Sequence, residues 1–289
     1  MNGNKYYATF QGFEPPDTAQ VISESVKGIL KRSLEKNFTQ QALATIYGCI
    51  DLTTLNSLDT KETVSQLVKK VNGFEGTHTV PNVAAICTYP VFVETVKRSL
   101  LAKDVKIASV AAGFPSSQTF LEVKIAETAM AVMAGAEEID VVLNLGYFME
   151  GDYQAISDEL AEIKKSCRGA ILKVILETGA LVTPENIRQA TILALYGGAD
   201  FIKTSTGKGY PGVTPEAFYT LCKVVKQYHE LTGNKIGVKV SGGIRSAEEA
   251  VIYYTIVENI LGKAWQDKTL FRIGASGLAA DIEKHVGIN

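Results

Sequence analysis

The chain has few of the residues that build metal centres and disulfide frameworks. Among its 289 residues there are only four cysteines and three histidines. The cysteines, at positions 49, 87, 167 and 222, form no Cys-x-x-Cys pair and have no histidine at zinc-ligand spacing. We therefore expect reduced cysteines that pack mostly in the core, and a reaction that needs no metal.

An excess of one charge and long apolar runs are also missing. The 29 basic and 31 acidic residues nearly cancel, and no dense Lys/Arg run is present to neutralise a line of phosphates. No segment approaches the ~18 continuous apolar residues of a membrane span, and the first residues lack the apolar core of a signal peptide. We expect no nucleic-acid partner, no membrane partner and a cytosolic location.

Eight apolar runs of strand length alternate with segments of helical periodicity. This alternation indicates a parallel sheet, and eight is the number of strands in a closed α/β barrel. We therefore predict an α/β fold, the (β/α)8 TIM barrel. A doubly wound open sheet is the alternative, because strand number alone does not prove closure. The predicted strands are residues 45–52, 83–88, 105–111, 138–144, 171–177, 201–205, 236–241 and 271–275.

Helix boundaries are readable between several of these strands. Residues 60–71 place valines and a leucine on one face, and Gly73 is the expected stop. Further helix starts are indicated by Thr-Pro pairs at 183–184 and 214–215, and by the capping-box spacing of Ser246 and Glu249.

The segment before the first predicted strand is amphipathic from about residue 17 to residue 34. We expect it to form one extra helix that packs on the barrel. The domain prediction is therefore a single TIM-barrel domain over residues 1–289, with a helical extension at 1–40 and the barrel at 41–289.

Three consecutive predicted strands carry a lysine inside an apolar run: Lys173, Lys203 and Lys239. A buried ammonium costs several kcal/mol unless it is paired or neutralised, so buried lysines are rare. In a barrel, alternate strand residues point inward and the C-terminal strand ends converge on one mouth. Mutual repulsion and desolvation would lower a lysine pKa there and leave free amine to attack a carbonyl. The pattern favours imine chemistry.

A purely structural interpretation competes with this one. Each lysine could face solvent at a strand end, or pair with Glu177, Asp140 or Asp200. That interpretation is better for a single lysine, but three in consecutive strands favour function.

Two carboxylates occupy comparable places, Asp51 at the end of the first predicted strand and Asp140 in the fourth. Each could steady an ammonium or move a proton. Taken alone, either is better explained as a structural partner or strand cap, and Glu137 or Glu138 would then be surface charge.

Glycine-rich turns follow the sixth, seventh and eighth predicted strands, at residues 204–209, 241–245 and 274–277. Any one of them could simply make a tight turn, but together they favour an anion site. Exposed backbone N–H groups, with Lys208 or Arg245, would match the phosphate site of such barrels. We find no nucleotide-binding loop, so no cofactor is predicted and the partner should be a small phosphorylated substrate.

From about Thr45 to the C-terminal helix, the sequence strongly resembles the deoxyribose-phosphate aldolase family. The resemblance rests on several motifs in a fixed order. They are Asp51-Leu-Thr-Thr-Leu, Ala85-Ile-Cys-Thr-Tyr-Pro, Glu138-Ile-Asp-Val-Val, Leu172-Lys-Val-Ile, Asp200-Phe-Ile-Lys-Thr-Ser-Thr-Gly-Lys, Lys239 before Ser241-Gly-Gly-Ile-Arg, and Gly274-Ala-Ser.

The resemblance implies a metal-independent class I aldolase of deoxyribose phosphate catabolism. Such an enzyme reversibly cleaves 2-deoxy-D-ribose 5-phosphate to acetaldehyde and D-glyceraldehyde 3-phosphate. By the same resemblance, Lys203 forms the Schiff base, while Lys239 depresses its pKa and joins Asp140 in proton relay. Lys173 and Asp51 would complete the polar shell and orient a substrate hydroxyl or a relay water. A homodimer is a further expectation from the family.

The predicted substrate contacts come from the turns and the motifs together. Cys87 is included because it matches a cysteine near the family's active site, although packing is the better explanation for it. The full set is Asp51, Cys87, Lys173, Thr204, Gly207, Lys208, Gly242, Gly243, Arg245, Gly274 and Ser276.

The chain also departs from the family pattern. Gly277 stands where a second serine is frequent, and Val240-Ser241 replaces a frequent Pro-Ala, so fewer side chains would contact the phosphate. The chain ends at Asn289 without the terminal tyrosine that assists proton transfer in some members. Two alternatives stay open: another Schiff-base barrel aldolase, of the transaldolase or 2-keto-sugar-phosphate kind, and a non-catalytic sugar-phosphate sensor.

Overall fold

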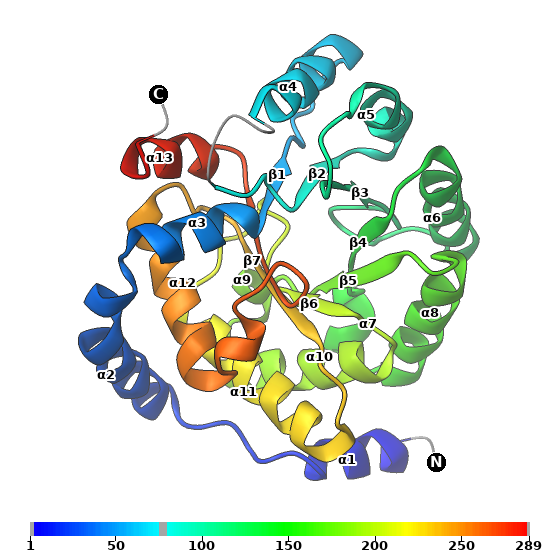
Figure 1. Ribbon diagram of the computed structural model, residues 1–289. Coiled ribbons are helices and arrows are strands. Elements are labelled where there is room, and N and C mark those ends of the chain that lie inside the picture. The colour runs from blue at the N-terminus through cyan, green and yellow to red at the C-terminus, as the bar shows by residue number, and fades with distance from the viewer. Residues whose placement is uncertain (1–2, 75–79, 288–289) are drawn as a thin grey trace.

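Eight parallel strands close into a barrel in the computed structural model, which describes residues 3–74 and 80–287. The strands follow one another around the barrel in chain order, and β8 pairs with β1 to close it (Figure 1). The predicted TIM barrel is therefore confirmed, and the open sheet is excluded. The strands are β1 (Ile50–Thr53), β2 (Ala85–Thr88), β3 (Lys106–Val110), β4 (Glu138–Val142), β5 (Ile171–Ile175), β6 (Phe201–Lys203), β7 (Gly237–Ser241) and β8 (Phe271–Ala275).

The first predicted strand is wrong over most of its length. Residues 45–48 belong to helix α3 (Gln40–Gly48), and β1 begins only at Ile50. Thr39 caps the helix by accepting a hydrogen bond from the Ala42 N–H. The segment is rich in β-branched and aromatic residues, but its apolar side chains lie on one helical face and are buried. Tertiary packing therefore overrides strand propensity here.

Helices surround the barrel (Figure 1). Gly73 does not stop its helix, because α4 runs on to Phe74, but the three predicted caps at Thr183, Thr214 and Ser246 are present. The remaining helices are α1 (Gly3–Gln11), α2 (Ala19–Asn37), α4 (Lys61–Phe74), α5 (Val93–Ser99), α6 (Leu121–Ala134), α7 (Leu145–Glu150), α8 (Tyr153–Ser166), α9 (Thr178–Leu181), α10 (Pro184–Tyr196), α11 (Pro215–Thr232), α12 (Ala247–Ile260) and α13 (Leu278–His285), with short 3-10 turns η1 (Pro90–Phe92) and η2 (Lys263–Trp265).

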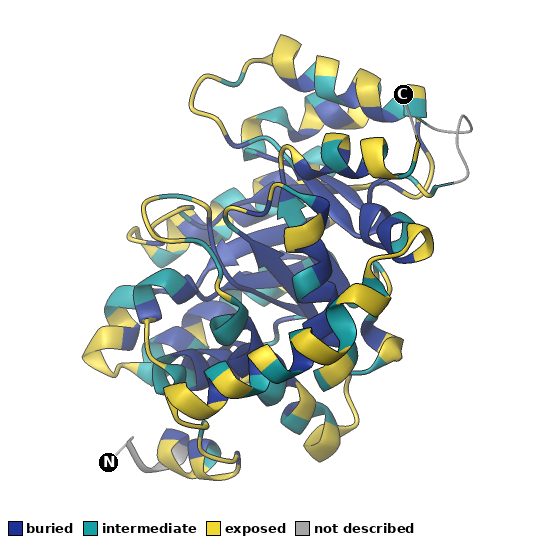
Figure 2. Ribbon diagram, turned by 90° about the vertical axis from the view of Figure 1, so that its left-hand side faces the viewer, coloured by how far each residue is buried: buried dark blue, intermediate teal, exposed yellow. Residues whose placement is uncertain are grey.

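The N-terminal extension contains two helices, α1 and α2, where one was predicted. Helix α2 packs across α12 and α11 and buries Ile22, Val26 and Ile29 against them. The segment after α1 is held by Arg188 of α10, which donates to the backbone carbonyls of Phe10, Phe13 and Glu14. Figure 2, which faces this side, shows exposed residues on the outer face of the helices and mostly buried residues in the strands.

The single tryptophan lies beside the barrel wall. Trp265 is buried in η2, and its indole Nε1 donates to the carbonyl of Ile236, 2.9 Å away, just before β7. The ring of His229 meets it edge-on and the Lys235 ammonium lies over its face. Among the described residues, no helix combines the length and hydrophobicity needed to cross a membrane.

Candidate active site

The three strand lysines converge inside the barrel, as predicted. Lys173 lies on β5, Lys203 ends β6 and Lys239 lies on β7. Lys203 and Lys239 occupy the same register on adjacent strands. Lys173 and Lys239 have no solvent exposure, and Lys203 retains 3%. The solvent-facing interpretation of these lysines is therefore wrong.

Asp140 on β4 joins all three ammonium groups. Its Oδ2 atom lies 2.8 Å from Nζ of Lys203 and 2.8 Å from Nζ of Lys239. Its Oδ1 atom accepts from Nζ of Lys173 at 3.0 Å. One carboxylate thus fixes the spacing of three cations, and it does so next to the lysine predicted to be the nucleophile.

A second tier of charge supports this centre. Asp51 on β1 accepts from Lys239 at 2.5 Å and from Nη1 of Arg272 at 2.6 Å. Arg272 on β8 also binds Glu138, with 2.8 Å from Nη2 to Oε1. Glu138 in turn lies 2.5 Å from Nζ of Lys173. Glu138 is fully buried, so its interpretation as surface charge is wrong, whereas exposed Glu137 pairs with Lys106.

Sequence reasoning missed Arg272 altogether, although a signal was present. Like the lysines, Arg272 is a cation inside an apolar strand, Phe271–Ala275, and it shares a register position with Lys239. The same argument that singled out the lysines applies to it.

Burial and the neighbouring positive charges shift the pKa values of the carboxyls in this site in opposite directions. Burial alone would raise the pKa of Asp140, but the neighbouring ammoniums of Lys173, Lys203 and Lys239 hold it well below its usual value. The pKa of Asp51 is lowered for the same reason, because Lys239, Lys173 and Arg272 outweigh its burial. Both carboxyls are therefore ionised at neutral pH.

The pKa values of the three lysines do not shift in the same direction. Burial lowers the pKa of Lys203, and although Asp140 opposes this, the Lys239 ammonium adds to the lowering. Burial also works against the ammoniums of Lys173 and Lys239, but their carboxylate partners prevail and raise the pKa of each. The expected lowering of a lysine pKa is therefore found at Lys203, whereas the pKa values of Lys173 and Lys239 are raised because each of these two contacts more than one carboxylate.

Counting charges in this network explains the difference. Four buried cations, Lys173, Lys203, Lys239 and Arg272, face three buried carboxylates, Asp51, Glu138 and Asp140. One positive charge is in excess, and an uncompensated charge in a low-dielectric interior is expensive. Releasing one proton would balance the network, and Lys203 has the fewest carboxylate contacts, which agrees with the lowering of its pKa.

Of the three strand lysines, Lys203 is the one that lines a pocket. This open cavity has a volume of about 560 Å³ and is bordered by the loops after β1, β6, β7 and β8. Of the predicted contact residues, those that line it are Gly207, Lys208, Gly242, Gly243, Arg245, Gly274 and Ser276. Asn56 and Asp59, from the loop after β1, also line it and were missed.

The other predicted contact residues lie behind the pocket wall. Asp51, Lys173 and Cys87 are fully buried. The Cys87 thiol packs with small apolar side chains, and burial raises its pKa, which supports packing over chemistry. The Thr204 hydroxyl bonds the backbone of Ser241 in both directions and so ties β6 to β7.

Glycine is required at two positions in the pocket wall. Gly242 has φ +92°, and a side chain there would lie 2.8 Å from the Cα of Gly212. A side chain at Gly274 would lie 3.1 Å from Cε of Lys239. Glycine thus brings the backbone N–H groups of these turns close to the cavity and leaves room for the lysine.

Two contacts hold the loop after β6. Lys208 donates from Nζ to the Leu55 carbonyl at 2.6 Å, across to the loop after β1. Glu177, which has a positive φ of 56°, accepts from the N–H and hydroxyl of Thr206. Burial raises the pKa of Glu177 despite these hydrogen bonds. The strained backbone at Glu177 is consistent with a role in positioning this loop.

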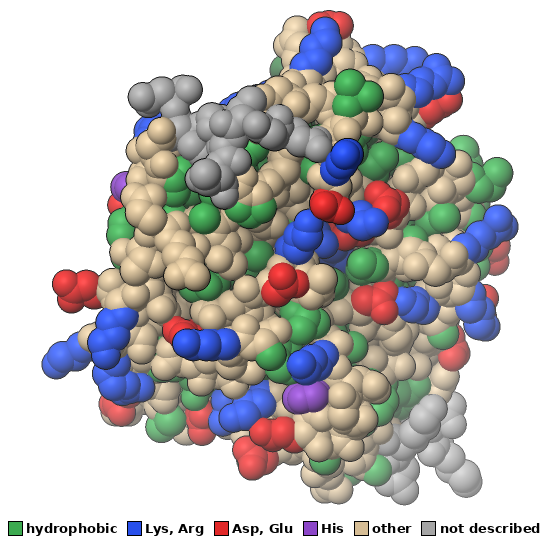
Figure 3. Space-filling model, viewed as in Figure 1, with side chains coloured by type: hydrophobic (Ala, Val, Ile, Leu, Met, Phe, Trp, Pro, Cys, Tyr) green, Lys and Arg blue, Asp and Glu red, His purple; other side chains and the backbone are tan. Residues whose placement is uncertain are grey.

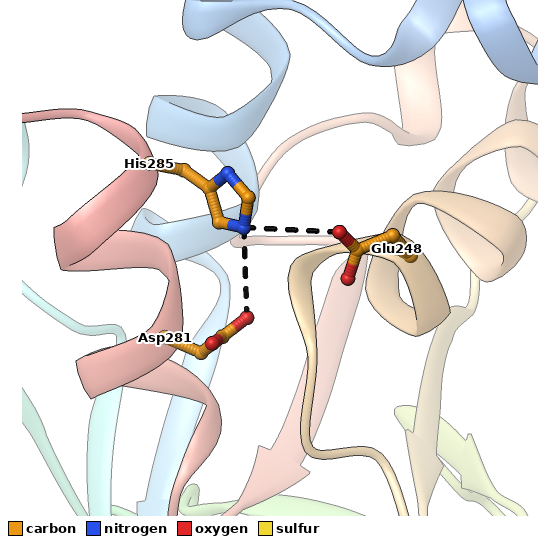
Figure 4. Close-up of side chains that lie close together, drawn as sticks. All are labelled: Glu248, Asp281 and His285. Carbon is orange, nitrogen blue, oxygen red and sulfur yellow. Dashed lines mark ion pairs between the residues drawn. The ribbon is translucent and has the colours of Figure 1, made fainter.

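A group of possible metal ligands lies outside the barrel. Among the residues described, Glu248, Asp281 and His285 are the one such group, with His285 Nε2 3.8 Å from Glu248 and 3.9 Å from Asp281 (Figure 4). They join α12 to α13, and Asp281 also accepts from the N–H of Ala247. This exposed group joins two helix ends and takes no part in the lysine network.

Comparison with known proteins points to one family. The profile of the DeoC/LacD family aldolases matches residues 45–279. The deoxyribose-phosphate aldolase of Bos taurus is 38% identical over 270 residues, covering 89% of this chain and 84% of that protein. The Mus musculus protein of that name is 37% identical over 279 residues, covering 93% and 88%. A solved structure, described as a unique tetrameric structure of deoxyribose phosphate aldolase from Aeropyrum pernix, matches with TM-score 0.68 and 28% identity over 90% of this chain and 97% of that one.

Proposed function

Because the chain belongs to the DeoC/LacD aldolase family, we propose that it reversibly cleaves 2-deoxy-D-ribose 5-phosphate to acetaldehyde and D-glyceraldehyde 3-phosphate. The enzyme is a class I aldolase, and Lys203 is the proposed Schiff-base residue. The observation that carries this assignment is that Lys203 alone combines a lowered pKa with access to the pocket.

The proposed reaction begins with the neutral amine of Lys203. Its lone pair attacks C1 of the open-chain sugar, a proton from the relay is added to the resulting C1 hydroxyl, and loss of water gives a protonated imine. The C3 hydroxyl then loses its proton, the C2–C3 bond breaks, and its electron pair moves into the imine to form an enamine. D-glyceraldehyde 3-phosphate leaves at this stage. Protonation of the enamine at C2 and hydrolysis of the new imine release acetaldehyde and restore Lys203.

Each proton shift needs a group that can both accept and give. Asp140 and Lys239 are the proposed relay, since Asp140 touches both Lys203 and Lys239 through one oxygen. A proton can therefore pass along this chain without leaving the interior. Lys173, with Glu138 and Arg272 behind it, would act by holding Asp140 in place, because its ammonium binds Oδ1 of Asp140, whereas Lys203 and Lys239 bind Oδ2.

The proposed phosphate site is the far end of the pocket. The turns at Gly242 and Gly243 and at Gly274 supply backbone donors, and Ser276 and Arg245 supply side chains. This end matches the phosphate position after strands seven and eight of such barrels.

The experiment is to incubate the protein with 2-deoxyribose 5-phosphate and sodium borohydride, with a chelator present, and to locate reduced adducts by peptide mass spectrometry. An adduct on Lys203 supports the proposal. Lys208→Met is the matched control, because Lys208 lines the same pocket and should not carry the adduct. It should leave the Lys203 adduct intact, while Lys203→Leu should remove it.

The alternatives give different results in the same experiment. A sugar-phosphate sensor would bind the substrate and form no adduct on any lysine. Another Schiff-base aldolase would trap a keto sugar phosphate in place of the deoxyribose compound, and product analysis would separate the two.

Three broader proposals accompany the catalytic one. The chain would form one domain, which the packing of α2 on α11 and α12 supports. It would self-associate, in line with the tetramer described for the Aeropyrum pernix relative, and a homodimer is the form proposed. A cytosolic location fits its four buried free thiols.

A further inference from the structure

Glu177, just after β5, is a buried acid that pairs with no cation. The acidic side chains drawn in Figure 3 lie at the surface, within reach of water, whereas Glu177 is 2% exposed. A buried charge without a partner of opposite sign costs free energy, so Glu177 calls for an explanation other than stability. Each of the other buried acids in the described part of the chain forms an ion pair with lysine or arginine; they are Asp51, Glu138, Asp140 and Glu159.

The backbone at both ends of α9 is strained. Glu177, just before this four-residue helix, has φ +56°, and Val182, just after it, has φ +61° and ψ −52°. Across Val182, the Thr183 N–H donates to the Leu181 carbonyl at 2.6 Å, which makes the rare and strained form of the γ-turn. Positive φ is uncommon outside glycine, and it persists only where surrounding contacts enforce it. The contacts of residues 177–182 are therefore the place to look for a function.

These contacts are made with the loop after β6, residues 204–214. The Thr178 N–H donates to the Thr204 carbonyl at 2.8 Å, so the two segments are joined where the loop begins. Further along, a side chain at Gly179 would lie 2.2 Å from the carbonyl oxygen of Pro211. The backbone of α9 therefore touches the backbone of the loop at two separate points.

The Glu177 side chain adds a third link, which leads to the pocket. Each of its carboxylate oxygens lies 3.3 Å from the Thr206 nitrogen, and the Thr206 hydroxyl donates to Oε2. The same hydroxyl oxygen accepts from the Lys208 N–H at 3.0 Å. Thr206 and Lys208 line the pocket, and Glu177 does not. Its side chain makes no capping hydrogen bond to α9, so helix capping does not explain it.

We propose that Glu177 is a positioning residue, which acts through Thr206 to fix the loop after β6 and so the placing of Lys203 and Lys208 at the pocket. The inference rests on the proposed aldolase function, because it takes this pocket as the substrate site. A carboxylate suits the task, since it accepts from the N–H and the hydroxyl of one threonine and its charge strengthens both hydrogen bonds.

The placing of this loop bears on the chemistry because the loop begins directly after Lys203. An attacking amine must come within about 3–3.5 Å of the carbonyl carbon, and a misplacement of about 1 Å can cost on the order of a hundredfold in rate. Burial raises the pKa of Glu177, and the Thr206 hydrogen bonds and the Lys203 ammonium oppose that rise. The buried charge and the strained backbone are thus explained by the loop that Glu177 holds.

The first test is hydrogen exchange, measured by mass spectrometry on the peptide that spans residues 204–210. Glu177→Ala should raise the exchange rate of its protected amides, those of Thr206 and Lys208, by at least about tenfold, because their acceptors are lost or displaced. Thr178→Val is the matched control, since the buried Thr178 hydroxyl has no hydrogen-bond partner among the described residues, and the rate should stay at the wild-type value. An unchanged rate in Glu177→Ala overturns the proposal.

The second test is kcat/KM for 2-deoxyribose 5-phosphate, expressed per folded molecule. Glu177→Ala should lower it by at least about tenfold, and Thr178→Val should leave it unchanged. Thr206→Val should lose about as much as Glu177→Ala, whereas Thr206→Ser keeps the hydroxyl and should retain most of the activity. If Glu177 only stabilised the fold, its replacement would move the thermal unfolding midpoint and leave kcat/KM per folded molecule at the wild-type value, which would contradict the proposal.

The double variant Glu177→Ala/Thr206→Val tests whether the two residues act through one contact. Its loss should be no greater than that of the more impaired single variant, and additive losses would refute the link. Thr206→Val breaks the same contact from the loop side, so the exchange measurement can be made on it if Glu177→Ala does not fold. A wild type that fails to cleave 2-deoxyribose 5-phosphate would contradict the proposed function alone, because hydrogen exchange needs no substrate and tests the Glu177 link by itself.

Discussion

Two sites among the described residues bury lysine, and they do so in different ways. Between α6 and α8, Lys124 meets one carboxylate, Glu159, and the pair is closed off from solvent. Inside the barrel, Lys203 shares Asp140 with two other lysines and opens onto a pocket. The first site is balanced in charge and the second has one cation too many. Burial alone therefore does not make a lysine reactive; an excess of positive charge beside a cavity does.

Removing the reactive amine should have the largest effect of any substitution at these two sites. Lys203→Leu should lower kcat by at least about a thousandfold, because no other pocket-lining amine is placed beside Asp140. The fold should persist, since the substitution leaves three cations facing three carboxylates. Turnover measurements check the loss of activity, and the thermal unfolding midpoint checks that the fold persists. Full activity in this variant would refute the Schiff-base assignment.

The stability of the same variant has a definite sign. The pKa of Lys203 is lower in the folded chain than its usual value, so below that value the unfolded chain binds more protons and folding is penalised. Leu at this position removes the penalty. The variant should therefore unfold no more easily than wild type at neutral pH.

At the Lys124–Glu159 site, where the charges balance, removal of the lysine should lower the stability of the fold. Lys124→Met leaves Glu159 buried without its partner and should destabilise the chain by about 3–5 kcal/mol. Urea unfolding measures this loss, and kcat per folded molecule should not change. Replacing both groups, as Lys124→Met/Glu159→Leu, should restore most of the stability. A double variant as unstable as the single one would show that the cost does not come from the unpaired charge.

The charge count in the barrel can be altered without touching the nucleophile. Lys239→Met removes a cation that lowers the pKa of Lys203, and the network then balances with Lys203 protonated. The acid limb of kcat/KM against pH, which reports loss of the neutral amine, should move up by about one to two pH units. An acid limb that stays in place would mean that charge balance does not govern Lys203.

Replacing Arg245, an exposed charge at the pocket mouth, should affect substrate binding more than turnover or stability. Arg245 is exposed and lines the proposed phosphate end, so Arg245→Met should raise KM about tenfold with little change in kcat. Unphosphorylated 2-deoxyribose serves as the control substrate, because its kcat/KM should be unaffected. Equal losses for both substrates would argue against a phosphate contact.

Most of the barrel could be predicted from local pattern, because parallel strands buried on both faces appear as apolar runs. The segment before β1 failed this test: residues 45–48 are β-branched and aromatic, yet they pack as a helix. Nothing local distinguishes the two outcomes, since the decision comes from the buried face that Leu43 and Ile46 share. Helix α1 was missed because its docking depends on Arg188, far along the chain, which donates to the carbonyl of Phe10.

The sequence was enough to predict which lysines form the site, but it was not enough to predict which carboxylate each of them binds. Lysines in adjacent strands had to meet, and they do. Which carboxylate each one binds depends on strand register and on reach across the barrel interior. Arg272 and Glu138 are 134 residues apart and lie on strands that are not neighbours, so their hydrogen bonds leave no trace in the local sequence.

Trp265 gives this enzyme an optical reporter at a useful place. Its indole is bonded to the residue before β7, the strand that carries Lys239, and its own turn leads into β8, which carries Arg272. Because the chain has one tryptophan, its emission reports this corner of the barrel without any label. An emission change that coincides with loss of helical circular dichroism would mean that the catalytic wall and the helical layer come apart in one cooperative step.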